Sequence, residues 1–175
     1  TAAAKGAVLD SGRVRVRVDQ TTGGISELRA RGVSGNFADT TAGETLNDYR
    51  YFIGDDPARI QRNGPVRITV GEPGPLVASL IIESAAPGCH SLRREVRVVS
   101  GLDHVELINH VDKARLAAAS YLAPEGKESV NFAFPFRVPD GAIELDLPLA
   151  RMRPEADQIP GACKNWFTVG RWASV

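Results

Sequence analysis

The sequence has no excess of charge of one sign and no long apolar run. Its 21 lysines and arginines balance 21 aspartates and glutamates, so the formal net charge is zero. Phosphate backbones and anionic membrane surfaces attract proteins with a surplus of basic residues, so we expect neither nucleic acid nor a membrane as a partner. No apolar stretch approaches the roughly 20 residues that a transmembrane helix requires.

Cysteine is scarce as well. Cys89 and Cys163 are too few for a disulfide framework, and the sequence leaves open whether they pair with each other. Residues 1–6 lack a methionine and the apolar core of a secretory signal, so either a signal has been removed or the chain is cut from something longer. A bacterial cytoplasmic, periplasmic or secreted location therefore stays open, as does the oligomeric state.

What the sequence does contain is typical of a folded domain. Hydrophobic residues make up 43% and charged residues 24%, which excludes wholesale disorder. A chain of 175 residues buries roughly 70% of its unfolded surface, enough for one core. We therefore expect residues 1–175 to form a single domain.

Alternation of apolar and polar residues is the dominant pattern. Residues 13–18 alternate strictly, so their valines face one way and their arginines the other. The same reading predicts further strands at 25–28, 66–70, 76–83, 92–99, 104–112, 131–138, 143–147 and 165–175. With 11 prolines and 17 glycines between short runs, the pattern indicates an all-β protein with an antiparallel β-sandwich. Residues 113–123 are either a short helix or an ordered loop.

The strand at 104–112 carries metal-ligand residue types. His104, Glu106, His110 and Asp112 fall on one face, but residues six apart on a strand are about 20 Å apart. One ion could not reach both histidines unless the strand folded back. We predict a solvated polar face and no metal site.

Arg13, Arg15 and Arg17 form a second candidate row. Guanidinium groups about 6.6 Å apart could bind a polyanion. The neutral net charge and acidic strands such as 143–146 favour cross-strand ion pairs instead.

The loop at 151–161 combines arginines, carboxylates and a glutamine between prolines. Glu155 and Asp157 have the residue types of a glycosidase pair, but neighbours on one loop do not easily flank a glycosidic bond. Two readings remain: a loop locked by internal ion pairs, or a loop presented to a neighbouring domain or a sugar.

Two aromatic groups could stack on sugar rings or fill a core. One surrounds Tyr49, and the other contains Trp166 and Trp172. Because aromatic residues make up only 6% of the chain, we expect the core to use most of them. No Ser-His-Asp or Cys-His order stands out, and Gly23-Gly24 is no phosphate loop.

Several segments occur in a recognisable order. They are the hairpin 14–28 with its D-x-x-T-G-G-I motif, 47–51, the N-G-P-V-R of 63–67, the E-x-x-x-F-x-F-P-F of 128–136, 153–161 and 166–172. In that order they resemble the C-terminal β region of glycoside hydrolase family 38, the α-mannosidases.

The resemblance implies a galactose-mutarotase-like supersandwich, whose completeness it leaves open because the chain stops just after Arg171-Trp172. It also implies a parent enzyme that hydrolyses α-mannosides with retention. That family's zinc ligands and aspartate nucleophile lie in an N-terminal α/β domain, to which nothing in this chain corresponds. We therefore carry over no catalytic residue, no metal ligand and no cofactor to this chain, and assign zinc to the absent catalytic domain.

The leading hypothesis is a non-catalytic β module, cut from a longer multidomain glycoside hydrolase, whose partners are its own N-terminal catalytic domain and carbohydrate. The cut is expected because the strand predicted to close the chain stops without a turn. The residues expected at those contacts are Arg153, Glu155, Asp157, Gln158, Asn165, Trp166 and Tyr49.

Two alternatives stay open. One is a free-standing carbohydrate-binding module with an exposed platform of Trp166, Trp172 or Tyr49. The other is an aldose-epimerase-like enzyme with a histidine acid and a glutamate base in a concave pocket, for which the sequence offers His90, His104 and His110.

Overall fold

The computed structural model describes residues 1–54, 56–116, 126–164 and 166–175. Contacts divide the chain into two compact units, 1–137 and 138–175, and each is described by itself. The described residues hold antiparallel strands and two single 3-10 turns, Thr41–Gly43 and Pro57–Arg59, with no α-helix among them. The all-β prediction is confirmed. Most of the alternative helix or loop at 113–123 lies outside the described residues.

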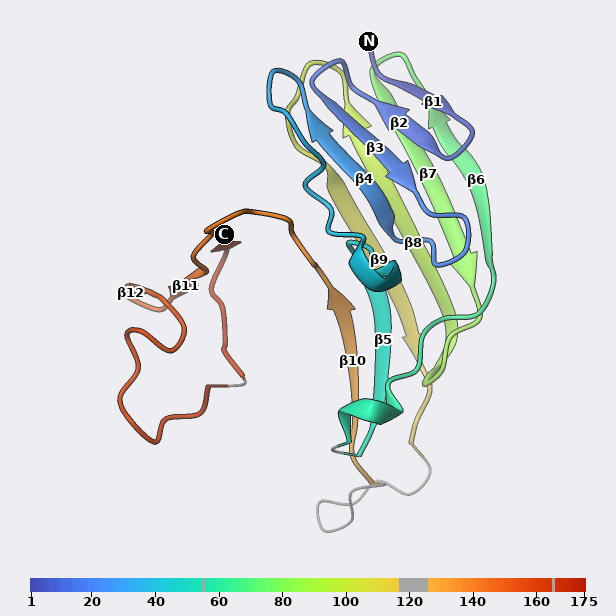
Figure 1. Ribbon diagram of the computed structural model, residues 1–175. Coiled ribbons are helices and arrows are strands. Elements are labelled where there is room, and N and C mark those ends of the chain that lie inside the picture. Colours follow the sequence, from blue (N-terminus) through green and yellow to red (C-terminus); the bar gives the residue numbers. More distant parts are fainter. Residues whose placement is uncertain (55, 117–125, 165) are drawn as a thin grey trace. The chain divides into compact units, whose positions relative to one another are not determined.

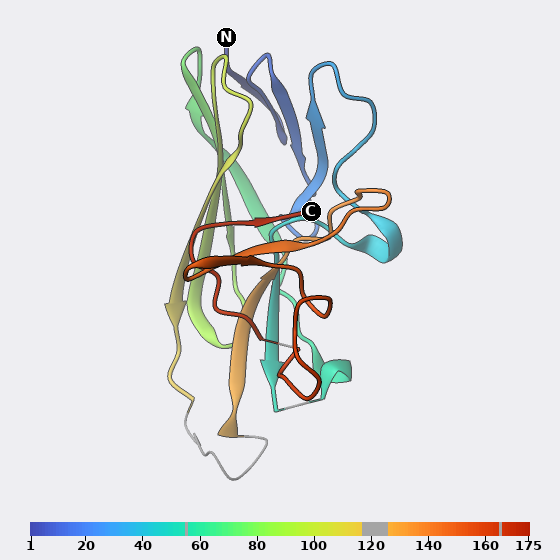
Figure 2. The same cartoon turned by 90° about the vertical axis from the view of Figure 1, so that its left-hand side faces the viewer.

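Two four-stranded antiparallel sheets make the sandwich of the first unit (Figure 1). The first sheet contains β1 (Ala3–Lys5), β2 (Val8–Asp10), β3 (Val14–Val18) and β4 (Ile25–Ala30), in that order. The second contains β6 (Val66–Pro73), β7 (Val77–Ser84), β8 (Cys89–Val99) and β9 (Glu106–Lys113), also in chain order. Figure 2 shows them as separate layers, one blue and the other green to yellow.

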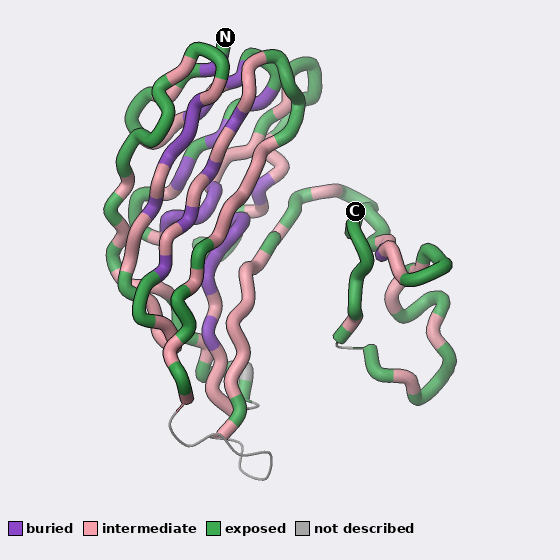
Figure 3. Tube along the Cα trace, turned by 180° about the vertical axis from the view of Figure 1, so that it is seen from behind, coloured by how far each residue is buried: buried purple, intermediate pink, exposed green. Residues whose placement is uncertain are grey.

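The core between the sheets follows from the alternation in β3. Val14, Val16 and Val18 are buried, whereas Arg15 and Arg17 between them are exposed. The valines pack in one cluster with Leu80 and Ile82 of β7 and with Val96 and Val98 of β8. Each such side chain contributes about 1.5–3 kcal/mol when it is fully buried. Figure 3 shows the alternation as purple segments along the strands.

A smaller pair of strands, β5 (Asp48–Ile53) and β10 (Glu128–Ala133), packs on another part of β8 and β9. Tyr49 and Tyr51 of β5 form a second core cluster with Leu92 and, around them, Val111 and Phe132. An antiparallel bridge between Ile25 and Leu46 joins the start of β4 to the segment before β5.

The second unit is a small sheet with β11 (Glu144–Leu147) in the centre, between β12 (Ala150–Met152) and β13 (Ala173–Ser174). Leu145 is the buried hydrophobic residue of its described part. The predicted strand at 165–175 is wrong over most of its length. Before β13 the pairing with β11 is irregular: Asp146 donates its backbone N–H to Trp172 and accepts the backbone N–H of Gly170 on its carbonyl oxygen and that of Arg171 on its carboxylate.

The predicted strand at 131–138 is shifted. β10 begins at Glu128 and ends at Ala133, and residues 134–137 add one isolated bridge, between Phe136 and Ala38. Pro135 has no N–H to donate to a ladder, which accounts for the early end.

Candidate functional site

Arg94 lies at the centre of the polar interior of the first unit. It is the largest fully buried side chain described, because it shares the inner face of β8 with Leu92 and Val96. Its Nη2 donates to the carbonyl oxygen of Thr22 at 2.8 Å and its Nη1 to that of Asn47 at 3.2 Å. We call the polar residues gathered there the Arg94 cluster: Asp19, Thr22, Asn47, Asp48, Asn63, Arg94 and Asn109.

The D-x-x-T-G-G segment forms the turn that presents Thr22 to Arg94. The Oδ1 of Asp19 accepts the backbone N–H groups of Thr21 at 2.9 Å and Thr22 at 2.7 Å. Gly23 follows with φ +72°, and a Cβ on it would overlap the Nη2 of Arg94. A Cβ on Gly24 would overlap Thr45. The glycine pair is therefore explained by close packing and not by phosphate binding.

Two further segments meet the same cluster. Asn47 and Asn109 exchange side-chain hydrogen bonds at 2.9 and 3.0 Å. The Nδ2 of Asn63 donates to the carbonyl oxygen of Thr22 at 3.2 Å. Segments 19–24, 47–51 and 63–67, far apart in the sequence, thus share one set of contacts.

The cluster contains one buried carboxylate, that of Asp48, whose charge is poorly compensated. Asp48 is fully buried, and neither carboxylate oxygen has a hydrogen-bond donor among the described residues. Its Oδ2 lies 3.4 Å from the Nε of Arg62 and 3.6 Å from that of Arg50. Burial raises the pKa of Asp48 above its ordinary value, although the charges of Arg62 and Arg94 oppose the shift.

Burial also lowers the pKa of Arg94, to about 10, while the charge of Asp48 opposes that change. Because Arg94 and Asp48 have no exposed surface, the arrangement can hold two sheets and a turn together but can reach no substrate. The Arg94 cluster is a structural centre of this unit.

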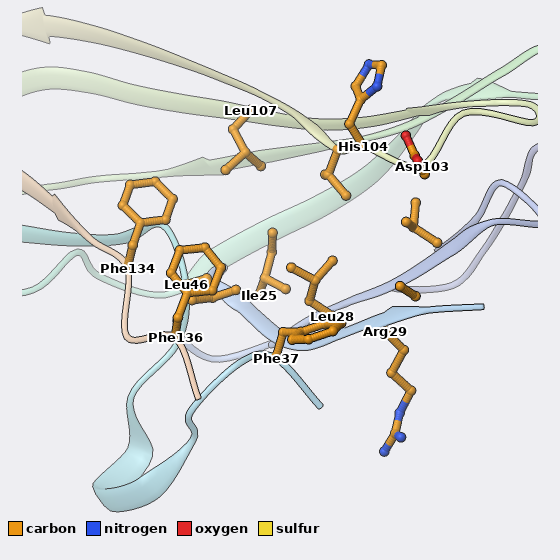
Figure 4. Close-up of a pocket in the computed structure, with 13 residues that line it drawn as sticks. Ile25, Leu28, Arg29, Phe37, Leu46, Asp103, His104, Leu107, Phe134 and Phe136 are labelled. Atoms are coloured by element: carbon orange, nitrogen blue, oxygen red, sulfur yellow. The ribbon is translucent and has the colours of Figure 1, made fainter. Parts of the chain in front are cut away.

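A cavity of about 280 Å³ opens at the edge of the sandwich, between β4, the start of β9 and the chain after β10 (Figure 4). Its wall is mostly apolar, with Leu28, Leu46, Phe134 and Phe136 among the lining residues. The rings of Phe134 and Phe136 stack with centroids 6.4 Å apart. Such a wall suits an apolar surface rather than a hydroxylated ring.

His104 and Asp103 stand at one end of this cavity, and Figure 4 shows Arg29 directing its guanidinium group away from it. No glutamate is among the lining residues of the described chain. Glu106 comes within 3.8 Å of the Nε2 of His104, but it is held by Arg97 at 2.5 Å. The free glutamate base that an epimerase needs is not in the cavity.

The loop at 151–161 is closed by its own hydrogen bonds. The Nη2 of Arg153 lies 2.9 Å from the Oδ1 of Asp157, whose Oδ2 accepts the backbone N–H of Arg153 at 2.8 Å. Gln158 accepts the backbone N–H of Glu155 and donates to the carbonyl oxygen of Cys163, both at 2.8 Å. The hydrogen bonds from Arg153 lower the pKa of Asp157. The loop is thus locked as predicted, but by one internal ion pair and hydrogen bonds, since Arg151 pairs with Glu144 outside the loop.

The other residues that were expected at contacts differ in how far they are exposed. Trp166 is 71% exposed, whereas Asn165 lies outside the described residues. Tyr49 is fully buried, with its hydroxyl donating to the carbonyl oxygen of Pro87 at 2.5 Å and its ring edge-on to Phe132. The prediction that Tyr49 makes a surface contact is therefore wrong. Tyr49 and Tyr51 alternate with Arg50 along β5, so both tyrosines point into the core.

The remaining sequence candidates have ordinary surroundings. His110 lies opposite Arg93 in the register of β8 and β9. In the described part of the chain, no three His, Cys, Asp or Glu side chains are grouped so that they could hold a metal ion. Both cysteines are free thiols. Arg15 and Arg17 pair with acidic residues as predicted, but the partners are Asp10 and Glu27 rather than residues of 143–146.

The sequence reasoning missed Arg94 and Asp48. A signal for Arg94 exists, since Leu92, Arg94, Val96 and Val98 form one alternating set, and an arginine in an apolar row requires internal acceptors. Asp48 has no such signal, because it precedes two tyrosines in a segment that was not predicted as a strand.

Neither a protein-family model nor a protein of curated function matches this sequence. In the residues that the structure describes, no helix is long and apolar enough to cross a membrane.

Proposed function

We propose that the chain is a non-catalytic β module of an α-mannosidase-like glycoside hydrolase, which supports a catalytic domain and contributes to carbohydrate binding. One observation supports it above the others. Three of the segments that carry the resemblance, 19–24, 47–51 and 63–67, are linked around Arg94, which donates to Thr22 and Asn47, while Asn63 donates to Thr22.

The proposal includes a galactose-mutarotase-like supersandwich as the finer description of the β-sandwich. It gives zinc and the aspartate nucleophile to the catalytic domain and none to this chain. The centre of the Arg94 cluster then has a structural role, since Arg94, Asn47 and Asp48 are buried and Arg94 donates to the backbone carbonyl oxygens of Thr22 and Asn47.

The sugar contact is assigned to the second unit. Trp166 offers an exposed aromatic face, and the closed loop holds Arg153, Asp157 and Gln158 in fixed positions. An aromatic face stacks on the apolar face of a sugar ring, and fixed polar groups can meet its hydroxyls.

An assay of the chain on an aryl α-mannoside with added zinc tests the non-catalytic part. We expect no turnover above the rate of the buffer with zinc. Turnover that depends on the protein, and that persists after repeated purification, would overturn this part of the proposal.

A free-standing carbohydrate-binding module is the second candidate. The exposure of Trp166, together with 37% exposure of Trp172, favours it. Both readings predict binding of mannose oligosaccharides, but a free-standing module should saturate well below about 1 mM, because it needs no second domain. Weaker binding favours the supporting module.

A further inference from the structure

The outward face of the first sheet concentrates positive charge. It carries the arginine face, defined as Arg13, Arg15, Arg17, Arg29 and Arg31, with two carboxylates, Asp10 and Glu27, among them. The chain as a whole has no net charge, so this excess is local.

The arginines face one another across the strands. Arg15 of β3 lies directly opposite Arg29 of β4 in the ladder. At the next step, the backbone N–H of Arg31 donates to the carbonyl oxygen of Arg13 at 2.7 Å. Like charges that lie directly opposite in a sheet are destabilising, so two such pairs in succession are not explained by the stability of the sheet.

The nearby carboxylates do not neutralise this arrangement. Glu27 is shared by three guanidinium groups, at 3.2 Å from Arg15, 3.8 Å from Arg17 and 3.6 Å from Arg29. Asp10 reaches Arg15 at 3.7 Å. In the part of the chain that the structure describes, no carboxylate lies within 4 Å of Arg13 or Arg31.

A hollow of about 350 Å³ lies where Arg13 and Arg31, which have no carboxylate within 4 Å in the described chain, meet the partly neutralised Arg15 and Arg29. Arg13, Arg15, Arg29 and Arg31 line it, together with Asp10 and Gly12. We propose that this hollow binds a tetrahedral oxyanion, a phosphate or sulfate group, either free or as an ester on a small molecule. Guanidinium forks donate paired hydrogen bonds to such groups, and a bound dianion would relieve the repulsion between the opposed arginines.

The test is a titration of the full chain followed by NMR of the arginine Nε–Hε groups, at constant ionic strength. The probes are inorganic phosphate, inorganic sulfate, mannose 6-phosphate and mannose. We expect saturable shifts at Arg13, Arg15, Arg29 and Arg31 with the three anions and none with mannose. Equal affinity for phosphate and its sugar ester would identify the anion itself as the ligand, and tighter binding of the ester would identify a phosphorylated saccharide.

Two variants and a control make the result decisive. The double substitution Arg13→Gln with Arg31→Gln should weaken phosphate binding about tenfold or more, because charge-assisted hydrogen bonds are lost. Glu27→Gln should tighten it, since Glu27 competes for the same guanidinium groups. Arg67→Gln, on the other sheet and paired with Glu83, should change it less than about twofold.

Uniform shifts at every surface arginine, an unchanged affinity in the double variant, or equal binding of mannose would overturn the proposal. The backbone spectrum of each variant reports folding, so a loss of binding is not confused with unfolding. The proposal is independent of the glycoside hydrolase reading, since it stands on the arginine face alone.

Discussion

The Nη2 of Arg94 lies 2.8 Å from the carbonyl oxygen of Thr22, a residue 72 positions earlier in the chain. This contact joins β8 of one sheet to the turn that precedes β4 of the other. It explains the D-x-x-T-G-G segment, which forms the turn that presents the carbonyl oxygen of Thr22 to Arg94. Replacement of Arg94 therefore affects both sheets, whereas Thr22 takes part through its main chain.

Arg94→Met is expected to lower the free energy of unfolding by about 3 kcal/mol or more. It leaves the buried carbonyl oxygen of Asn47 without its donor, leaves that of Thr22 with Asn63 alone, and removes a positive charge near Asp48. Urea denaturation measures the change. Arg67→Met, an exposed ion-pair arginine, is the control and should cost less than about 1 kcal/mol. Similar small losses in both variants would contradict the account.

Gly23→Ala and Gly12→Ala separate close packing from backbone conformation. Both glycines have positive φ, at +72° and +79°, but only the Cβ at position 23 meets neighbours. Gly12→Ala should cost about 1 kcal/mol, which is the penalty of the left-handed conformation. Gly23→Ala should cost about 2 kcal/mol more, because Arg94 must move or lose its bonds. Equal losses in thermal unfolding would refute the close contact.

The two aspartates of the cluster should show opposite dependence on pH. The pKa of Asp48 is raised in the folded state, so its stabilising contribution is complete below 3.8 and is lost as the pH rises through the folded value. The destabilisation caused by Asp48→Asn should therefore shrink between about pH 3 and pH 7. Unfolding by urea across this range measures it.

The pKa of Asp19 is shifted in the opposite direction, so its contribution to stability depends on pH in the opposite way. Burial acts to raise its pKa, but the hydrogen bonds from Thr22 and Thr21 together outweigh it and lower the pKa. Its contribution is present above 3.8 and is lost as the pH falls through the folded value. The penalty of Asp19→Asn should grow from about pH 3 to pH 7. Parallel curves for the two variants would contradict the opposite shifts.

Asp157→Asn should loosen the loop of the second unit without unfolding the chain. The substitution removes the charge that receives three hydrogen bonds from Arg153. Faster hydrogen exchange within 153–161, with little change in melting temperature, is expected. Glu155→Gln is the matched control, because Glu155 takes part in the hydrogen bonds of this loop through its backbone N–H and not through its carboxylate. Equal effects of the two substitutions would show that the ion pair does not hold the loop.

The sequence predicted strands well where one face of the strand is buried and the other is exposed to solvent. β3 was recognised to within one residue, as 13–18 against the observed Val14–Val18, because valine and arginine alternate over its whole length. β5 was missed, since Asp48 and Tyr49 are both buried at its start and the alternation covers only Tyr49, Arg50 and Tyr51. The short β1 and β2 were missed because three residues show too little of the period-two pattern.

Less of the candidate site could be predicted from the sequence. The contacts within the loop at 153–161 are local and follow from opposite charges four residues apart, so they could be anticipated. The Arg94 cluster depends on long-range contacts between 19–24, 47–51 and 63–67, which no local pattern contains. The arginine face shows the same limit, because the pairing of Arg15 with Arg29 depends on the register of the ladder.

The central claim, a carbohydrate contact in the second unit, is tested most directly by tryptophan fluorescence. The chain has two tryptophans, Trp166 and Trp172, and both lie in that unit, so the emission reports on no other part. We predict that mannose oligosaccharides shift the emission saturably in the wild type and in Trp172→Phe, and that Trp166→Phe abolishes the shift. An emission that stays unchanged up to about 100 mM sugar, or a shift that persists in Trp166→Phe, would contradict the account.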